Sequence, residues 1–522
     1  NLAQDWDLQS PAANMKIGSI YVKGRNLMAA IPYYEQAIAL DQNYAPAYRE
    51  LGQLYSMAGR FNDSKKYFEK YLELTKGNIP AKIRYVNALF YAKEYEEVIK
   101  NVEEIFTVDN SRTYMNRIAG YSAYEEGNYE LATTYMDRLF ANLDADRIIK
   151  KDYIYYARIL ARKNQDYSKQ VIEFDNEADE LAKLQSRFAT LKGGPAKDKA
   201  KTDIDALTAK VEGHKASLAK AEQELNKSFE AYEKAIYFAD EEDLNMIYEK
   251  GTVQYSARRY ADAASTWSRL LEKGRDSEND YIQVGRAFYQ AKAFDKADET
   301  FNAMIKKYPD NLQGYLWLAN IASAKDPDSE LGLAKPRFEN LLQKATADSV
   351  KNVKEIYDAL RYLGYEALQN KRYDEAKAYY NRMMNLSPEY VVKAHGSLST
   401  MYMTMGEYPK AIEENNKILA VEPGNEAAKS TLQYISQLQK SAIPKAHPNE
   451  ITGVISDAAG EPIPGASVRV KDTAAEAWTN ARGEYKFVMP EASETLVISA
   501  KGYKSIEVAV TTRRIYNASL DK

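Results

Sequence analysis

The chain of 522 residues contains no cysteine and only three histidines. The absence of cysteine excludes disulfide bonds, cysteine nucleophiles and thiolate metal sites. No apolar run approaches the ~18 to 20 residues that a membrane-spanning helix needs. The formal net charge is only -4, and no long run of like charges marks a basic arm or an acidic tail. We therefore expect neither nucleic acid as the main partner nor a membrane-spanning segment.

The sequence also lacks the motifs of common catalytic sites. It has no G-x-S-x-G elbow, no P-loop and no dinucleotide-binding fingerprint. His214 falls on the apolar seam of a helical segment, and His395 has no second ligand at metal-binding spacing. His447 begins an H-x-x-E sequence, but Pro448 places it in a linker and no later histidine could complete a zinc site. We therefore predict a protein that is not an enzyme and that holds no cofactor or metal.

The stretch 279–311 contains the pattern that much of the chain repeats. Two amphipathic runs are joined by a short turn, and Pro309 closes the unit. Gly285 on the first run and Ala297 on the second are small enough to let two antiparallel helices approach closely, while Phe301 fills the space beside them. One such hairpin cannot bury its apolar face alone, so the pattern predicts a stack of hairpins.

The glycine of this pattern recurs at a fixed step. Gly18 and Gly52 are 34 residues apart, Gly251 and Gly285 are also 34 apart, and Gly120 follows Gly52 at twice that distance. A 34-residue helix-turn-helix repeat with small residues, aromatics and proline at matched offsets resembles the tetratricopeptide family. The resemblance implies an α-solenoid of about ten repeats that binds proteins and carries no active site of its own.

The period changes between residues 168 and 232. Apolar residues fall at three- and four-residue steps, Gly193 and Gly194 interrupt them, and a heptad pattern resumes on the return. This pattern predicts an antiparallel helical arm inserted into the fifth repeat, with a reach of ~36 Å at ~1.5 Å per residue. Two interpretations stay open: the arm lies along the solenoid as a buttress, or it projects and contacts a partner.

After a proline-containing linker the period becomes two, as in β-strands. Val468 and Val470 alternate with polar residues, and so do Tyr485 and Phe487. The runs ITGVISDAAGEPIPGASVRV, NARGEYKF and AKGY resemble the carboxypeptidase regulatory-like domain. That resemblance implies a seven-stranded, prealbumin-like β-sandwich, a non-catalytic appendage of peptidases and of outer-membrane transporters.

The predicted fold class is therefore mainly α: a tetratricopeptide solenoid with a helical-hairpin insertion, followed by a small β-sandwich. The predicted segments are repeats at 11–167, the arm at 168–232, repeats and a capping helix at 233–440, a linker at 441–450 and the sandwich at 451–522.

The family resemblance also implies where a partner binds. In tetratricopeptide arrays the first helix of each repeat lines the concave face, and certain of its positions contact peptides. The Lys and Asn of a chaperone-tail carboxylate clamp are missing, because Met15, Ser19 and Glu50 stand at the clamp positions. Carried onto this sequence, the contact positions are Asn245, Tyr248, Thr252, Tyr255, Asn279, Gln283, Arg286, Tyr289, Trp317, Asn320, Arg361, Tyr362 and Tyr365. Some of these aromatic residues could instead pack between repeats.

The two resemblances together predict a non-enzymatic scaffold of the bacterial cell envelope, of a type found in Bacteroidetes. We expect a periplasmic, outer-membrane-associated component of a protein assembly, transport or secretion complex, whose partners are envelope proteins. Because the chain starts at Asn1, we expect that a signal peptide has been removed. The alternatives are a protein that binds glycan or peptidoglycan, and an accessory subunit of a peptidase encoded elsewhere.

Overall fold

The computed structural model describes residues 9–239, 241–442, 449–490, 495–510 and 515–521. The chain divides into two compact units, Asn1–Glu366 and Ala367–Lys522. His447 lies outside the described residues.

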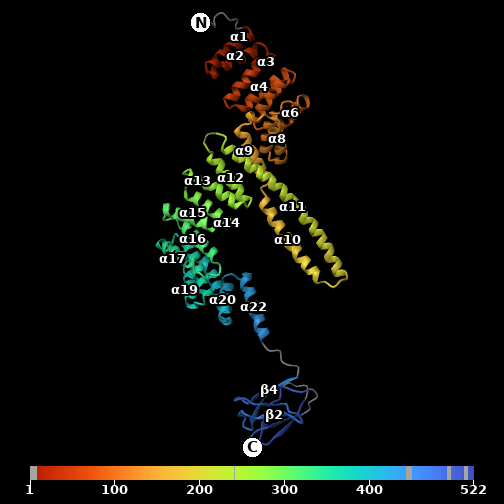
Figure 1. The fold of residues 1–522 in the computed structure, drawn as a ribbon, viewed down its shortest axis with the longest axis vertical. Coiled ribbons are helices and arrows are strands. Elements are labelled where there is room, and N and C mark those ends of the chain that lie inside the picture. The colour runs from red at the N-terminus through yellow and green to blue at the C-terminus, as the bar shows by residue number, and fades with distance from the viewer. Residues whose placement is uncertain (1–8, 240, 443–448, 491–494, 511–514, 522) are drawn as a thin grey trace. The chain divides into compact units, whose positions relative to one another are not determined.

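Helices follow one another as antiparallel hairpins from the N-terminus onward (Figure 1). The helices are α1 (Pro11–Lys23), α2 (Leu27–Leu40), α3 (Ala45–Met57), α4 (Phe61–Leu74), α5 (Ile79–Tyr91), α6 (Tyr95–Val108), α7 (Met115–Glu125), α8 (Tyr129–Asn142), α9 (Lys150–Lys163), α10 (Tyr167–Thr190), α11 (Pro195–Ile236), α12 (Leu244–Ser256), α13 (Tyr260–Glu272), α14 (Glu278–Gln290), α15 (Phe294–Lys307), α16 (Leu312–Lys325), α17 (Lys335–Ala345), α18 (Val353–Gln369), α19 (Tyr373–Met384), α20 (Pro388–Thr404), α21 (Tyr408–Val421) and α22 (Glu426–Ala442), with short 3-10 turns at Ala145–Arg147 and Thr346–Asp348. This succession confirms the predicted repeat solenoid.

In five hairpins a glycine of the first helix touches a large side chain that comes sixteen residues later in the second helix. The pairs are Gly18 with Tyr34, Gly52 with Phe68, Gly120 with Met136, Gly251 with Trp267 and Gly285 with Phe301. A Cβ atom added at Gly285 would lie 2.4 Å from Cε2 of Phe301, well inside van der Waals contact. The absence of a side chain at this position is therefore what lets the two helices of a hairpin close over a buried ring.

A buried ion pair joins the fourth hairpin to the fifth. Asp152, at the start of α9, is fully buried and accepts hydrogen bonds from Nε and Nη2 of Arg117 on α7, both at 2.7 Å. The hydroxyl of Tyr121 donates to the same carboxylate at 2.6 Å, and the backbone N–H of Ile149 donates at 2.9 Å. Burial raises the pKa of the Tyr121 phenol, and the hydrogen bond to Asp152 raises it further. The carboxylate is thus fully satisfied, as a buried charge requires.

Helices α10 and α11 form the inserted arm, and Figure 1 shows them running side by side away from the neighbouring hairpins. No residue of α10 is buried, whereas the last part of α11 packs on α9 and buries Tyr232. The hydroxyl of Ser228 donates to the carbonyl of Ala157 at 2.7 Å, as that of Ser64 does to the carbonyl of Gly52. The last turns of α11 are therefore the second helix of the fifth repeat, and the arm projects from it without a break.

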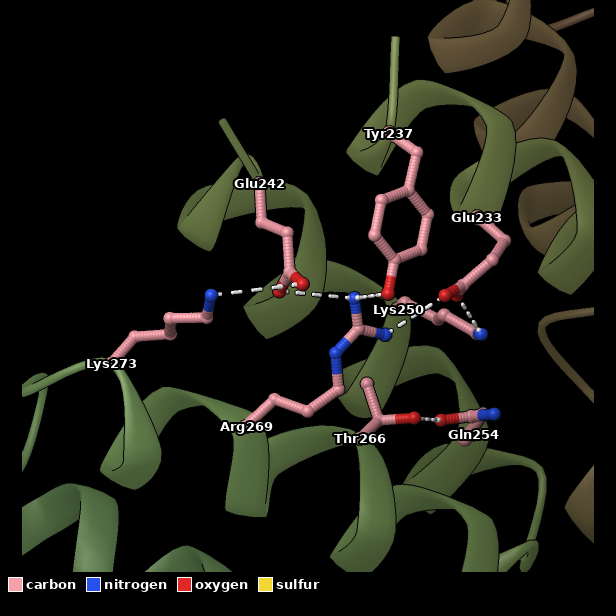
Figure 2. Close-up of polar contacts among 8 residues, drawn as sticks. All are labelled: Glu233, Tyr237, Glu242, Lys250, Gln254, Thr266, Arg269 and Lys273. Atoms are coloured by element: carbon pink, nitrogen blue, oxygen red, sulfur yellow. Dashed lines mark hydrogen bonds and ion pairs between the residues drawn. The ribbon is translucent and has the colours of Figure 1, made fainter. Parts of the chain in front are cut away.

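A polar network fixes the root of the arm to the sixth hairpin (Figure 2). Nη1 of Arg269 on α13 donates to Glu233 of α11 at 2.9 Å, and Nη2 reaches the hydroxyl of Tyr237 at 3.0 Å and Glu242 at 3.2 Å. Lys250 of α12 pairs with the same Glu233. Burial raises the pKa of the Glu233 carboxyl, but its bonds with Lys250 and Arg269 outweigh burial and hold the pKa below its ordinary value. The arm is therefore anchored through charges as well as apolar packing.

The C-terminal part of the chain is a two-sheet sandwich. Its strands are β1 (Glu450–Asp457), β2 (Ser467–Val470), β3 (Glu476–Trp478), β4 (Glu484–Val488), β5 (Thr495–Ser499), β6 (Ile506–Ala509) and β7 (Ala518–Leu520). One sheet has the order β4-β1-β7 and the other the order β3-β2-β5-β6. Ile455, Val468 and Ile498 are fully buried between them. The alternation of apolar residues predicted this sandwich, and the described strands confirm it.

Candidate functional site

A hollow of about 210 Å³ lies over α12 and α14 in the sixth and seventh hairpins. It is lined by Tyr248, Thr252, Tyr255, Ser256, Trp267, Gln283 and Arg286. Five of these seven residues belong to the contact set predicted from the repeat pattern. They meet because residues three, four and seven positions apart share one face of a helix. Both helices begin at a capped end, at Asp243 for α12 and at Ser277 for α14.

Ring contacts hold the aromatic wall of this hollow. The guanidinium of Arg275 lies 4.5 Å from the centre of the Tyr248 ring. The Tyr255 ring lies 5.7 Å from that of Trp267, whose Nε1 donates to the carbonyl of Tyr248 at 3.1 Å. Tyr248 and Tyr255 are only half-buried, so part of each ring faces the hollow. The wall is thus rigid but accessible, which favours binding because little side-chain freedom remains to be lost.

Gln283 places an unsatisfied polar atom at this hollow. Its Nε2 donates to the hydroxyl of Tyr248 at 3.2 Å, whereas its Oε1 is buried and accepts no hydrogen bond from any described group. Buried acceptors without a donor are rare in folded proteins because leaving one unpaired costs about 1–3 kcal/mol. Because solvent does not reach this oxygen, a bound N–H or O–H group would pair with it only after the Gln283 side chain turns toward the hollow.

A second hollow, of about 500 Å³, adjoins the first and shares Thr252 and Ser256 with it. Its other lining residues are Tyr124, Arg158, Ala161, Arg162, Asn164, Gln165, Leu225, Tyr232, Glu249, Val253 and Ala257. We refer to these two hollows together as the groove. Its floor crosses α9, α12 and α14, which are the first helices of three successive hairpins.

The charges of the groove are unevenly balanced. Nε and Nη2 of Arg158 bind both carboxylate oxygens of Glu249, at 2.7 and 2.8 Å, and this pair raises the pKa of the guanidinium. Arg162 and Arg286 are exposed, and no described carboxylate forms an ion pair with either. Arg286 instead lies 5.8 Å from the ring of Trp317. The groove therefore contains two guanidinium groups without an ion pair, that of Arg162 in the larger hollow and that of Arg286 in the smaller one.

The other predicted contact residues lie outside the groove. Trp317 stacks on Phe301 with ring centres 5.7 Å apart, and Tyr289 meets Trp317 edge-on, so both pack between hairpins beside Arg286. Tyr362 stacks on Phe338 at 4.0 Å and is also a packing residue. The remaining members line neither hollow: Asn245, Asn279, Arg361 and Tyr365 are exposed, and Asn320 is half-buried.

The predicted set missed Arg158 and Arg162, although a signal for them exists. Ala157 occupies the repeat position of Gly251, as the bond from Ser228 shows. Arg158 therefore stands at the offset of Thr252, and Arg162 at that of Ser256. The inserted arm obscures this register because it separates α9 from its partner helix in the sequence.

The described residues do not form a metal centre. None of their acidic and histidine side chains form a group that could hold a metal ion. His214 pairs with Glu177 at 2.7 Å across the arm, and His395 pairs with Glu414 at 2.6 Å. None of the described helices is both long enough and apolar enough to span a bilayer.

Family models match both parts of the chain. Tetratricopeptide repeat models match residues 11–44, 33–66, 248–311 and 363–390, and a CarboxypepD_reg-like domain model matches residues 451–521. The chain thus combines tetratricopeptide repeats with a C-terminal carboxypeptidase regulatory-like domain. Repeats of this family form protein-binding scaffolds, and no catalytic family is indicated.

Individual proteins resemble parts of the chain. A TPR repeat-containing protein of Methanocaldococcus jannaschii is 26% identical, with 33% of this chain and 28% of the relative covered. The Hsp70-Hsp90 organizing protein 1 of Glycine max is 21% identical, with 37% and 32% covered. The chain thus spans about a third of the length of these curated relatives. The solved C-terminal part of a TPR repeat-containing protein of Cytophaga hutchinsonii is 20% identical, with a TM-score of 0.33, and the match covers 67% of this chain and 98% of that one.

Proposed function

We propose that this tetratricopeptide-repeat protein with a C-terminal carboxypeptidase regulatory-like domain is a scaffold of the bacterial cell envelope that holds an extended segment of a partner protein in the groove. The observation that carries the proposal is the meeting of five predicted contact residues in one hollow. Aromatic rings with arginine and amide groups are the composition that protein interfaces favour.

The dimensions and charges of the groove define the segment that fits it. Packed helices lie about 8–10 Å apart, so the path over α9, α12 and α14 is about 20 Å long. An extended chain of about six residues covers that length. Acidic side chains of such a segment would pair with Arg162 and Arg286, which are both exposed. The preferred ligand is therefore a short, acidic, extended peptide segment.

The C-terminal domain supports the envelope location. Its family resemblance is to appendages of peptidases and outer-membrane transporters, so we place the chain in the periplasm, bound to a complex for assembly, transport or secretion of outer-membrane proteins. In this proposal the groove holds a segment of one partner protein, and the sandwich docks to a second component of the complex.

Trp478, which is 63% exposed on β3, favours a second candidate function, because an exposed indole can stack on the sugar rings of a glycan.

A crosslinking pull-down from native membranes tests the groove. The variant Tyr255→Ala/Arg286→Ala removes an aromatic and a charged contact, and it should recover at least tenfold less of the partner because such residues dominate interface energies. The matched control is Arg382→Ala/Tyr434→Ala, which removes the same two residue types from exposed positions on α19 and α22. Equal recovery by the two variants would contradict the proposal.

The same pull-down locates the envelope contact. Full-length chain and a version that ends at Lys440 are compared. Recovery of outer-membrane proteins only with the full-length chain is the expected result. Retention of the full-length chain on peptidoglycan, with no protein partner recovered, would favour the glycan function instead.

A further inference from the structure

The tip of the arm carries a strong excess of positive charge in a chain that is acidic overall. Residues 183–201 contain six basic residues and a single acidic one, Asp198, a net charge of +5 against -4 for the whole chain. The base of the same arm is acidic, with five carboxylates between residues 173 and 180. The excess forms no continuous run of like charges, because it is spread over α10, the turn and α11.

The positive charge at the tip is not used to hold the protein together. Arg187, Lys192, Lys199 and Lys201 are exposed, and none forms an ion pair with a described carboxylate. Lys199 and Lys201 lie in the second turn of α11, beyond the first turn in which the helix dipole acts on side chains. The four exposed side chains are therefore available for contact with another molecule.

The tip also lies far from the root of the arm. The arm is anchored at its root, where Glu224 accepts from Lys163 at 2.9 Å and Glu222 pairs with Arg259. From Pro195 to Glu222, α11 extends about 40 Å at ~1.5 Å per residue. The network around Arg269 fixes the last turns of the same unbroken helix (Figure 2). A contact at the tip is thus held at a distance from the groove.

The arrangement of the basic residues suits a flat anionic surface better than a pocket. Lys192 lies in the turn, Arg187 on α10, and Lys199 and Lys201 lie about 160° apart around α11 at ~100° per residue. The charge is therefore spread over the blunt end of the arm and is not gathered on one face of a helix. Clusters of exposed Lys and Arg are attracted to the anionic headgroups of a phospholipid surface.

We infer that the basic tip of the arm docks electrostatically on the anionic headgroups of a phospholipid bilayer. The contact is peripheral, because Phe188 and Leu191 at the tip are half-buried against the arm and Lys197 covers them. The arm then acts as a strut that holds the groove at a set distance from the membrane surface. This inference does not depend on what the groove binds.

Vesicle co-sedimentation with the full chain tests the inference. Wild-type protein should bind vesicles that contain phosphatidylglycerol and not vesicles of phosphatidylcholine alone, and added salt should release it because exposed charges are screened. The variant Lys192→Glu/Lys199→Glu/Lys201→Glu should bind the anionic vesicles at least tenfold more weakly.

The matched control is Lys66→Glu/Lys234→Glu/Lys306→Glu, which changes the net charge by the same amount at exposed positions away from the tip. It should keep wild-type binding. Circular dichroism should show unchanged helix content in both variants, since all six lysines are exposed. Equal losses in the two variants, or wild-type binding to neutral vesicles, would overturn the inference. Capture of the wild type by polyglutamate without vesicle binding would also overturn it and assign the tip to an acidic protein.

Discussion

Replacing Phe301 by alanine is expected to lower the free energy of unfolding by about 3–5 kcal/mol. The side chain is fully buried, its ring covers Gly285, and it stacks on Trp317 at 5.7 Å with the planes 5° apart. Removal leaves a cavity between two hairpins that neither helix can close alone. Urea unfolding followed by circular dichroism measures the loss.

A double-mutant cycle makes this prediction specific to the helix crossing. In the wild type, Gly285→Ala should destabilise, because its Cβ atom would lie 2.4 Å from the Phe301 ring. In the Phe301→Ala background the ring is gone, and Gly285→Ala should stabilise by up to about 1 kcal/mol because alanine favours the helix. Destabilisation of similar size in both backgrounds would show that Gly285 and Phe301 are not in contact.

The second large effect is expected at Asp152. Its replacement by alanine should cost about 3–5 kcal/mol, because it leaves the Arg117 guanidinium and the Tyr121 hydroxyl without their buried acceptor. Arg117 is one quarter exposed, so water compensates part of the loss and the lower end of the range is expected. Unfolding in urea is again the measurement.

Two further variants separate charge from packing at this junction. Asp152→Asn keeps the size of the side chain and should cost less than Asp152→Ala. Glu73→Ala breaks an exposed pair with Lys70 within α4 and should leave the unfolding midpoint unchanged. A wild-type midpoint for Asp152→Ala would mean that α7 and α9 are held together by apolar contacts alone.

Most of the fold could be predicted from the sequence because its determinants are local. The step of 34 residues between Gly251 and Gly285 sets the register of the hairpins, and alternation around Val468 sets the strands of the sandwich. The order of the sheets was not predictable, because the parallel pairing of β1 with β7 joins segments more than sixty residues apart. Local pattern says which residues face inward but not which strands become neighbours.

The candidate site was only partly predictable for a similar reason. Tyr248, Tyr255, Gln283 and Arg286 follow from their repeat positions, whereas Trp317 stands at such a position and yet packs against Phe301. The repeat position fixes the face of the helix, but the size of the neighbouring side chains decides whether a ring is free or buried. The unpaired Oε1 of Gln283 depends on three-dimensional packing and leaves no trace in the sequence.

The most direct test of the central claim, that the groove holds a partner protein, is site-specific photocrosslinking in living cells. A photoreactive phenylalanine analogue is placed at Tyr255 in the groove, or at the exposed Ser265 on α13 of the same hairpin. We predict a discrete crosslinked protein from position 255 and none from position 265. Crosslinks of equal yield from both positions, or from position 265 alone, would contradict the assignment of the groove as the binding site.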